Sequence, residues 1–244
     1  MKRFLIRLAY NGCQYHGWQI QENAHTVQAE LTEKLSILLK ESVSITGCGR
    51  TDTGVHASEF IAHFDVEKFI WKKKDLVYKL NSFLPSDIVI YDISEVSIKF
   101  NSRFDAISRT YRYYINHVKN PFKEGTSYYY NGDLNVDEMN KACLYLFDYI
   151  DFTSFSKLHT QTATNNCKIL FAKFERQGDD LIFTVTADRF LRNMVRALVG
   201  TLLEIGKGKL AAEEICRIIE AKDRSLAGFS VPAHGLFLEK VVYP

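Results

Sequence analysis

The sequence has little proline, few cysteines and almost no net charge, and each shortage narrows the class of protein. Only 4 of the 244 residues are proline and 46% are hydrophobic, which argues against a disordered chain and provides ample material for a core. The 5 cysteines are scattered and form no Cys-x-x-Cys pair. They indicate free thiols in a reducing compartment and argue against a zinc site.

Long apolar runs are also missing. The first residues, MKRFLIRLAYNG, are basic, but their apolar run is too short and interrupted for a signal peptide. No segment approaches the roughly 18 apolar residues of a membrane span. We therefore expect a cytoplasmic protein without membrane contact. The formal net charge of +2 neither requires nor excludes a nucleic-acid partner, so local clusters of basic residues have to decide.

Strand and helix patterns mix along the chain without regular alternation. Residues 3–10 alternate as in a strand, and residues 26–41 show helical spacing after Thr26, a residue type that caps helices. Further strands are expected at 43–46, 59–66, 87–96, 109–118, 168–177, 181–188 and 235–243, and further helices at 71–84, 136–147, 190–205 and 211–221. This mixture predicts an α+β protein. We place a domain boundary between residues 105 and 106, which gives domains 1–105 and 106–244.

A glycine-rich stretch, GCGRTDTGVHAS (47–58), contains a single carboxylate, Asp52. A lone Asp before Thr and Gly often marks only a turn or a helix cap. An aspartic protease needs two Asp-Thr-Gly carboxylates that share a proton, and no second copy exists. An enzyme phosphorylated on aspartate would have an acidic residue where Gly54 stands. Arg50, two residues before Asp52, instead suits binding of an anion beside a charged nucleophile.

Basic residues also gather near the expected helix 190–205. At about 100° per residue, Arg189, Arg192 and Arg196 fall within about 60° of one another, opposite an apolar face. Such a stripe suits a groove that binds a polyanion. A solvated helix face is the more common fate of such a stripe, so this pattern alone leaves both interpretations open.

Several motifs together carry a family resemblance. The segment GRTDTGVHA closely resembles GRTDAGVHA, the signature of the tRNA pseudouridine synthase A family. Further motifs of that family follow in order and spacing: YNGCQYHGWQIQ (10–21), FNSRFDAISRTYRYYI (100–115), DFTSFS (151–156), RFLRNMVRALVGTLLEIGKGK (189–209) and VPAHGLFLEKVVYP (231–244). The sequence is therefore identified as a member of this family, over nearly its whole length.

The resemblance implies a fold and a reaction. The fold would consist of two similar mixed or antiparallel-sheet domains, joined across a central basic catalytic cleft. The first domain would carry the Asp52 loop. The reaction would isomerise uridine to pseudouridine at positions 38 to 40 of the tRNA anticodon arm, without a cofactor or a metal. A homodimer would bind the tRNA through both subunits.

The resemblance also implies roles for individual residues. Asp52 would attack the ribose at C1′, trigger glycal formation by removing the C2′ proton, or attack uracil at C6. Tyr111 would stack on the flipped uracil and move a proton from C5, and Arg196 would pair with Asp52. The remaining expected contacts to the substrate come from arginines: Arg50, Arg103, Arg109, Arg189 and Arg192.

One segment departs from the family pattern. TQTATNNCKI (160–169) lacks the arginine that the family usually carries near residues 164–166, so a contact to tRNA is either lost or supplied by Lys168. The alternative class is an RNA-binding protein or RNA chaperone that has lost catalysis. The presence of Asp52, Tyr111 and Arg196 argues against this alternative.

Overall fold

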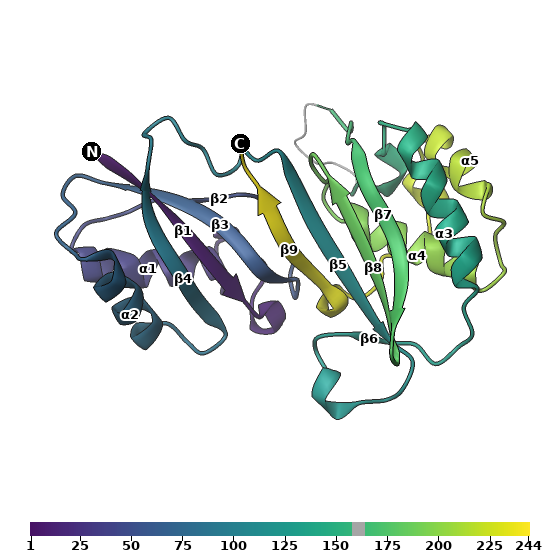
Figure 1. Cartoon of the computed structure of the whole chain (residues 1–244), viewed down its shortest axis with the longest axis horizontal. Coiled ribbons are helices and arrows are strands. Elements are labelled where there is room, and N and C mark those ends of the chain that lie inside the picture. Colours follow the sequence, from purple (N-terminus) through teal and green to yellow (C-terminus); the bar gives the residue numbers. More distant parts are fainter. Residues whose placement is uncertain (158–163) are drawn as a thin grey trace. The chain divides into compact units, whose positions relative to one another are not determined.

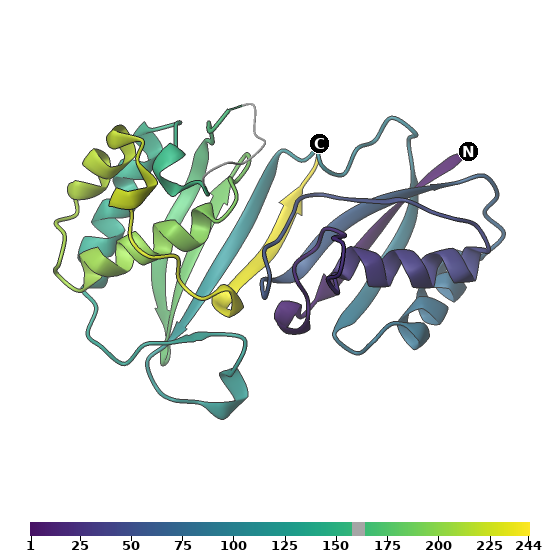
Figure 2. The same cartoon turned by 180° about the vertical axis from the view of Figure 1, so that it is seen from behind.

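The structure is a computed structural model that describes residues 1–157 and 164–244. The chain divides into two compact units, one made of residues 1–107 with 237–244 and the other of residues 108–236. Figure 1 and Figure 2 show that both units contain a sheet and helices. Among the described residues, none of the helices is long and apolar enough to cross a bilayer.

The first unit is a mixed sheet with helices on one face. Its strands β1 (Lys2–Tyr10), β3 (His56–Val66) and β4 (Ile88–Val96) pair antiparallel in the order β4-β1-β3. The short β2 (Ile45–Gly47) also pairs antiparallel with β3, and β9 (Leu236–Val242) pairs with it in parallel. Helices α1 (Val27–Leu39) and α2 (Lys73–Phe83) cover one face of this sheet (Figures 1 and 2).

Local sequence explains these elements. The alternation in β1 buries Phe4, Ile6 and Leu8 on one face, as period-2 patterning requires. Helix α1 begins after Thr26, whose hydroxyl accepts a hydrogen bond from the N–H of Ala29 at 3.4 Å. Both predictions are confirmed.

The second unit repeats the plan with other strands. Here β5 (Ser108–Asn116), β8 (Asp180–Ala187) and β7 (Ile169–Gln177) pair antiparallel in that order, and β6 (Tyr128–Tyr129) pairs in parallel with β5. Helices α3 (Val136–Tyr145), α4 (Met194–Gly206) and α5 (Glu214–Ala221) pack together beside this sheet (Figure 1). The predicted α+β class is confirmed.

The last strand belongs to the first unit. The sequence-based division after residue 105 assigned residues 236–242 to the second domain, whereas β9 pairs with β3 through His56 and Ala57. A pairing between segments so far apart along the chain depends on tertiary contacts. Local hydrophobic patterning contains no signal for it.

Candidate functional site

Asp52 lies on the loop between β2 and β3, and the segment after β1 holds this loop in place. The N–H of Trp18 donates to the carbonyl of Thr51 at 3.3 Å, and the N–H of Gly54 donates to the carbonyl of Tyr15 at 3.2 Å. Gly17 has a φ of +86°, and a Cβ there would lie 2.3 Å from the Thr51 oxygen, so only glycine fits. The segments YNGCQYHGWQIQ (10–21) and GRTDTGVHA (49–57) therefore form one local structure around the half-buried Asp52.

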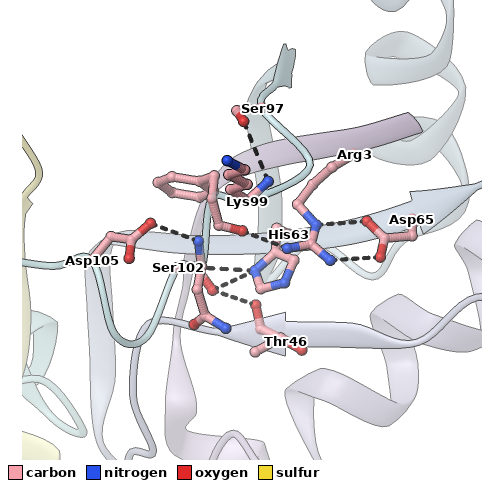
Figure 3. A network of polar contacts seen from close by, with 10 residues as sticks. Arg3, Thr46, His63, Asp65, Ser97, Lys99, Ser102 and Asp105 are labelled. Atoms are coloured by element: carbon pink, nitrogen blue, oxygen red, sulfur yellow. Dashed lines mark hydrogen bonds and ion pairs between the residues drawn. The ribbon is translucent and has the colours of Figure 1, made fainter. Parts of the chain in front are cut away.

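A second loop of the first unit, between β4 and β5, carries Arg103. Its anchor is Ser102, whose N–H donates to His63 Nδ1 at 3.2 Å and whose hydroxyl donates to the carbonyl of Thr46 at 2.7 Å. The hydroxyl of Tyr243 donates to the Ser102 carbonyl at 2.6 Å. Figure 3 shows that Ser102 lies between His63 of β3 and Thr46 of β2. The loop is thus fixed to two strands of the sheet.

An ion pair borders this network. Arg3 donates from two nitrogens to the carboxylate of Asp65, each at 2.7 Å, and from a third to the carbonyl of Phe100 at 2.6 Å (Figure 3). This contact lowers the pKa of Asp65. Burial, followed by the charge of Arg3, lowers the pKa of His63. The imidazole therefore stays neutral and accepts through Nδ1.

We expect the free energy of unfolding to depend on pH because of the buried imidazole of His63. Because the folded-state pKa of His63 lies below the unfolded value of about 6.5, the unfolded chain binds more protons as pH falls below that value. The contribution of His63 to the free energy of unfolding is therefore fully present above about pH 6.5. It decreases below that pH, by at most about 1.4 kcal/mol per unit of difference between the two pKa values. Urea unfolding at pH 8 and pH 5 measures the loss.

His63→Asn is the matched variant for this measurement. The Asn side chain keeps a hydrogen-bond acceptor near the position of Nδ1 but does not titrate. The loss of unfolding free energy between pH 8 and pH 5 should be smaller in this variant than in the wild type. An equal loss in both proteins would contradict the assignment to His63.

In the second unit, Tyr111 lies on β5 opposite Val185 of β8. Its ring is half-buried and meets Phe190 edge-on, with the ring centroids 5.1 Å apart at 86°. Further along the same face of β5, Tyr113 and Ile115 are completely buried. The predicted alternation of β5 is confirmed, and Tyr111 is more accessible than Tyr113 and Ile115 on the same face.

Arg196 lies in the first turn of α4 and holds the segment before β9. Its Nε donates to the carbonyl of Val231 at 2.7 Å, and its own carbonyl accepts from the Val231 N–H at 3.2 Å. The hydroxyl of Tyr113 donates to the carbonyl of the next residue, Pro232, at 2.8 Å. Burial raises the pKa of Tyr113 and lowers that of His234. The motif VPAHG is therefore fixed by α4 and β5.

The prediction that Arg189, Arg192 and Arg196 form a stripe on one helix was wrong. Helix α4 begins at Met194, and Asn193 directly before it has a left-handed backbone with φ of +67°. Asn tolerates this conformation better than most residues, and the helix begins only after it. Arg189 and Arg192 therefore precede the helix, and only Arg196 of the three lies on α4.

The other arginines lie at different places in the two units. Arg109 on β5 donates to the carbonyl of Asp188 at 2.9 Å, and the backbone N–H of Arg189 donates to the Asp188 carboxylate at 2.7 Å. Arg192 is exposed. In the first unit, Arg50 and Arg103 line the same pocket, which has a volume of about 250 Å³. Sequence reasoning named both arginines but not the pocket or its other residues.

The segment that lacks the family arginine is described only in part. Residues 160–163 lie outside the described residues. The side-chain amide of Asn165 donates to the hydroxyl of Thr153 at 3.0 Å, and the backbone N–H of Lys168 donates to Asp188 at 2.8 Å. Within the described ranges, no group of three His, Cys, Asp or Glu residues is placed to hold a metal ion. The expectation that no metal is needed stays a prediction.

Comparison with known proteins identifies relatives over the full length. A family model described as tRNA pseudouridine synthase matches residues 8–105 and 149–244. The chain is 54% identical to tRNA pseudouridine synthase A of Parabacteroides distasonis, with all of this chain and 97% of that protein covered. The proteins of the same name from Bacteroides thetaiotaomicron and Exiguobacterium sibiricum are 50% and 38% identical, with all of this chain and 91% and 98% of those proteins covered. Asp52 and Arg196 fall in the matched ranges, and Tyr111 falls between them.

Proposed function

Because the chain belongs to the tRNA pseudouridine synthase family, we propose that it isomerises uridine to pseudouridine in tRNA. The observation that carries the proposal is Asp52 in the segment GRTDTGVHA, on a loop that the first motif holds in place. Pseudouridine synthases are isomerases, so substrate and product have the same atoms. No oxidant, reductant or group donor is needed for the overall reaction.

The proposed chemistry breaks one bond and forms another at the same ribose carbon. The N1–C1′ bond of uridine breaks, the uracil rotates, and C5 bonds to C1′. The proton on C5 then leaves, and N1 gains one. Asp52 acts at C1′ as a nucleophile, or at the C2′ proton to give a glycal, and each route requires the ionised carboxylate.

Two residues of the second unit complete the proposal. Arg196 stabilises the charge of the Asp52 carboxylate, and its position is fixed by its hydrogen bond to Val231. Tyr111 stacks on the flipped uracil and moves the C5 proton. Its ring is only half-buried, whereas Tyr113 and Ile115 on the same face are completely buried. This supports the role, because a base needs an accessible aromatic surface to stack on.

The finer expectations are part of the same proposal. We propose that the target uridines lie at positions 38 to 40 of the anticodon stem-loop and that the protein acts in the cytoplasm as a homodimer that binds tRNA through both subunits. Arg109, Arg189 and Arg192 contact the tRNA backbone. The central basic cleft expected for the family stays a prediction.

Carbodiimide labelling tests the proposed function directly. Purified protein is incubated with an unmodified tRNA transcript that has uridines at positions 38 to 40, and pseudouridine is then detected by labelling and primer extension. We expect label at one or more of these positions and none in a transcript with cytidine there. Binding of the tRNA without any label would instead support the RNA-binding protein that lacks catalysis.

A further inference from the structure

The pocket that brings Arg50 and Arg103 together lies within the first unit. It has a volume of about 250 Å³ and opens beside Trp18, Gln19, Ser44 and Gly49. This volume is just below the range of about 300–1,000 Å³ that drug-sized ligands occupy. The pocket therefore fits a small group, such as a phosphate with part of its sugar.

The lining of the pocket favours an anion. Two arginines line it from separate loops, and none of the described residues that line it is acidic. Trp18 also lines it. A Cβ built on Gly49 would meet no atom within 4 Å, so the backbone there is open to a ligand. Guanidinium forks and neutral N–H donors together are the groups that bind phosphate.

The walls of the pocket are held in place before any ligand binds. The side-chain amide of Gln28 on α1 accepts from the N–H of Ile20 at 2.8 Å and donates to the carbonyl of Ile45 at 2.6 Å. It thus joins the segment after Trp18 to β2. The Trp18 ring stacks on Phe60 with centroids 4.0 Å apart. On the other side, Ser102 fixes the loop that carries Arg103.

We propose that this pocket binds one phosphate of the RNA backbone, next to the nucleotide that reacts. The inference rests on the proposed function, because Arg50 lies two residues before Asp52 on the same loop. Two residues span at most about 7 Å, so a phosphate on Arg50 belongs to a nucleotide that flanks the target. The pocket then sets the register of the RNA strand relative to the carboxylate.

A carboxylate placed in the pocket tests the proposal. Ser44 is exposed and lines the pocket, whereas Ser42 is exposed nearby and does not line it. Ser44→Asp and Ser42→Asp therefore add the same charge to the same segment. We expect Ser44→Asp to weaken tRNA binding roughly tenfold at low salt and to lower the slope of log affinity against log salt by about one phosphate contact, 0.7–0.9 units. Equal effects of both variants would overturn the proposal.

Tryptophan fluorescence reports on the pocket itself. The chain has 2 tryptophans, Trp18 and Trp71, so Trp71→Phe leaves Trp18 as the single emitter. In this background we expect tRNA to change the Trp18 emission, and Ser44→Asp to weaken that response while Ser42→Asp keeps it. An emission that tRNA does not change would overturn the proposal. Thermal unfolding confirms that each variant is folded.

Inorganic phosphate distinguishes a free anion from the RNA backbone. It is exchanged for chloride at constant ionic strength, and the Trp18 emission is followed in the Trp71→Phe protein. A response at submillimolar phosphate, combined with unchanged tRNA binding by Ser44→Asp, would assign the pocket to a free anion and overturn the RNA assignment. A response to tRNA alone supports it.

The labelling assay separates this inference from the proposed function. If the wild type forms pseudouridine but Ser44→Asp and Ser42→Asp bind tRNA equally, only the pocket assignment fails. If the Ser44→Asp effects appear but the wild type forms no pseudouridine, the pocket still binds RNA and the proposed reaction fails. For an active enzyme, Ser44→Asp should raise KM with little change in kcat, because the contact is present in both ground and transition state.

Discussion

Asp52→Asn is expected to abolish pseudouridine formation and leave tRNA binding intact. The amide has the size of the carboxylate but is neither a nucleophile nor a base. We expect kcat to fall by a factor of at least about 10⁴, which corresponds to about 5.4 kcal/mol of activation free energy. The measurement is single-turnover labelling of an anticodon stem-loop transcript, with the tRNA affinity determined in parallel.

The structure explains why the fold should tolerate this change. The change keeps the backbone hydrogen bonds of the loop, including the one from the Val55 N–H to the Asp52 carbonyl at 3.1 Å and the bonds of Thr51 and Gly54. Asp92→Asn is the matched control, since Asp92 is exposed on β4 and has no role in the proposed reaction. Turnover by Asp52→Asn within about tenfold of the wild type, a difference below about 1.4 kcal/mol, would exclude Asp52 as the nucleophile.

Local patterning predicts the elements that carry these residues. The alternation in β1 and β5 and the Thr26 cap of α1 are short-range signals, and the structure contains the elements they indicate. The same kind of argument gave a wrong prediction for the arginines before α4, because the helix begins only after them. Asn193 adopts a left-handed backbone, so the angular spacing that aligned Arg189 with Arg196 does not apply before α4.

Contacts between segments remote in sequence determine the parts of the fold and site that local sequence patterns do not predict. The pairing of β9 with β3 and the hydrogen bond from Ser102 to His63 connect segments that are remote in sequence. The pocket at Arg50 and Arg103 depends on the second of these contacts. A histidine in a strand and a serine in a loop have no distinctive local pattern, so the sequence alone does not indicate that they are in contact. Motif resemblance pointed to Arg103, and the structure adds what holds its loop.

The two proposed roles of Tyr111 can be separated by mutation. Tyr111→Phe keeps the aromatic ring and removes the hydroxyl, so tRNA should bind normally while kcat falls by about 10²–10⁴, the usual contribution of a positioned proton-transfer group. Tyr111→Ala should additionally lose about 1–3 kcal/mol of base stacking, seen as weaker tRNA binding. Titration of fluorescent tRNA and single-turnover labelling measure the two effects separately.

Tyr113→Phe is the matched control on the same strand. It removes the hydroxyl that donates to the carbonyl of Pro232, so it should lower the unfolding free energy by about 1–3 kcal/mol, because a buried acceptor loses its partner. Its kcat should stay near the wild-type value, since Tyr113 is completely buried and no base can stack on it. If Tyr111→Phe behaves like this control and keeps wild-type turnover, the proton on C5 is moved by another group and Tyr111 retains only the stacking role.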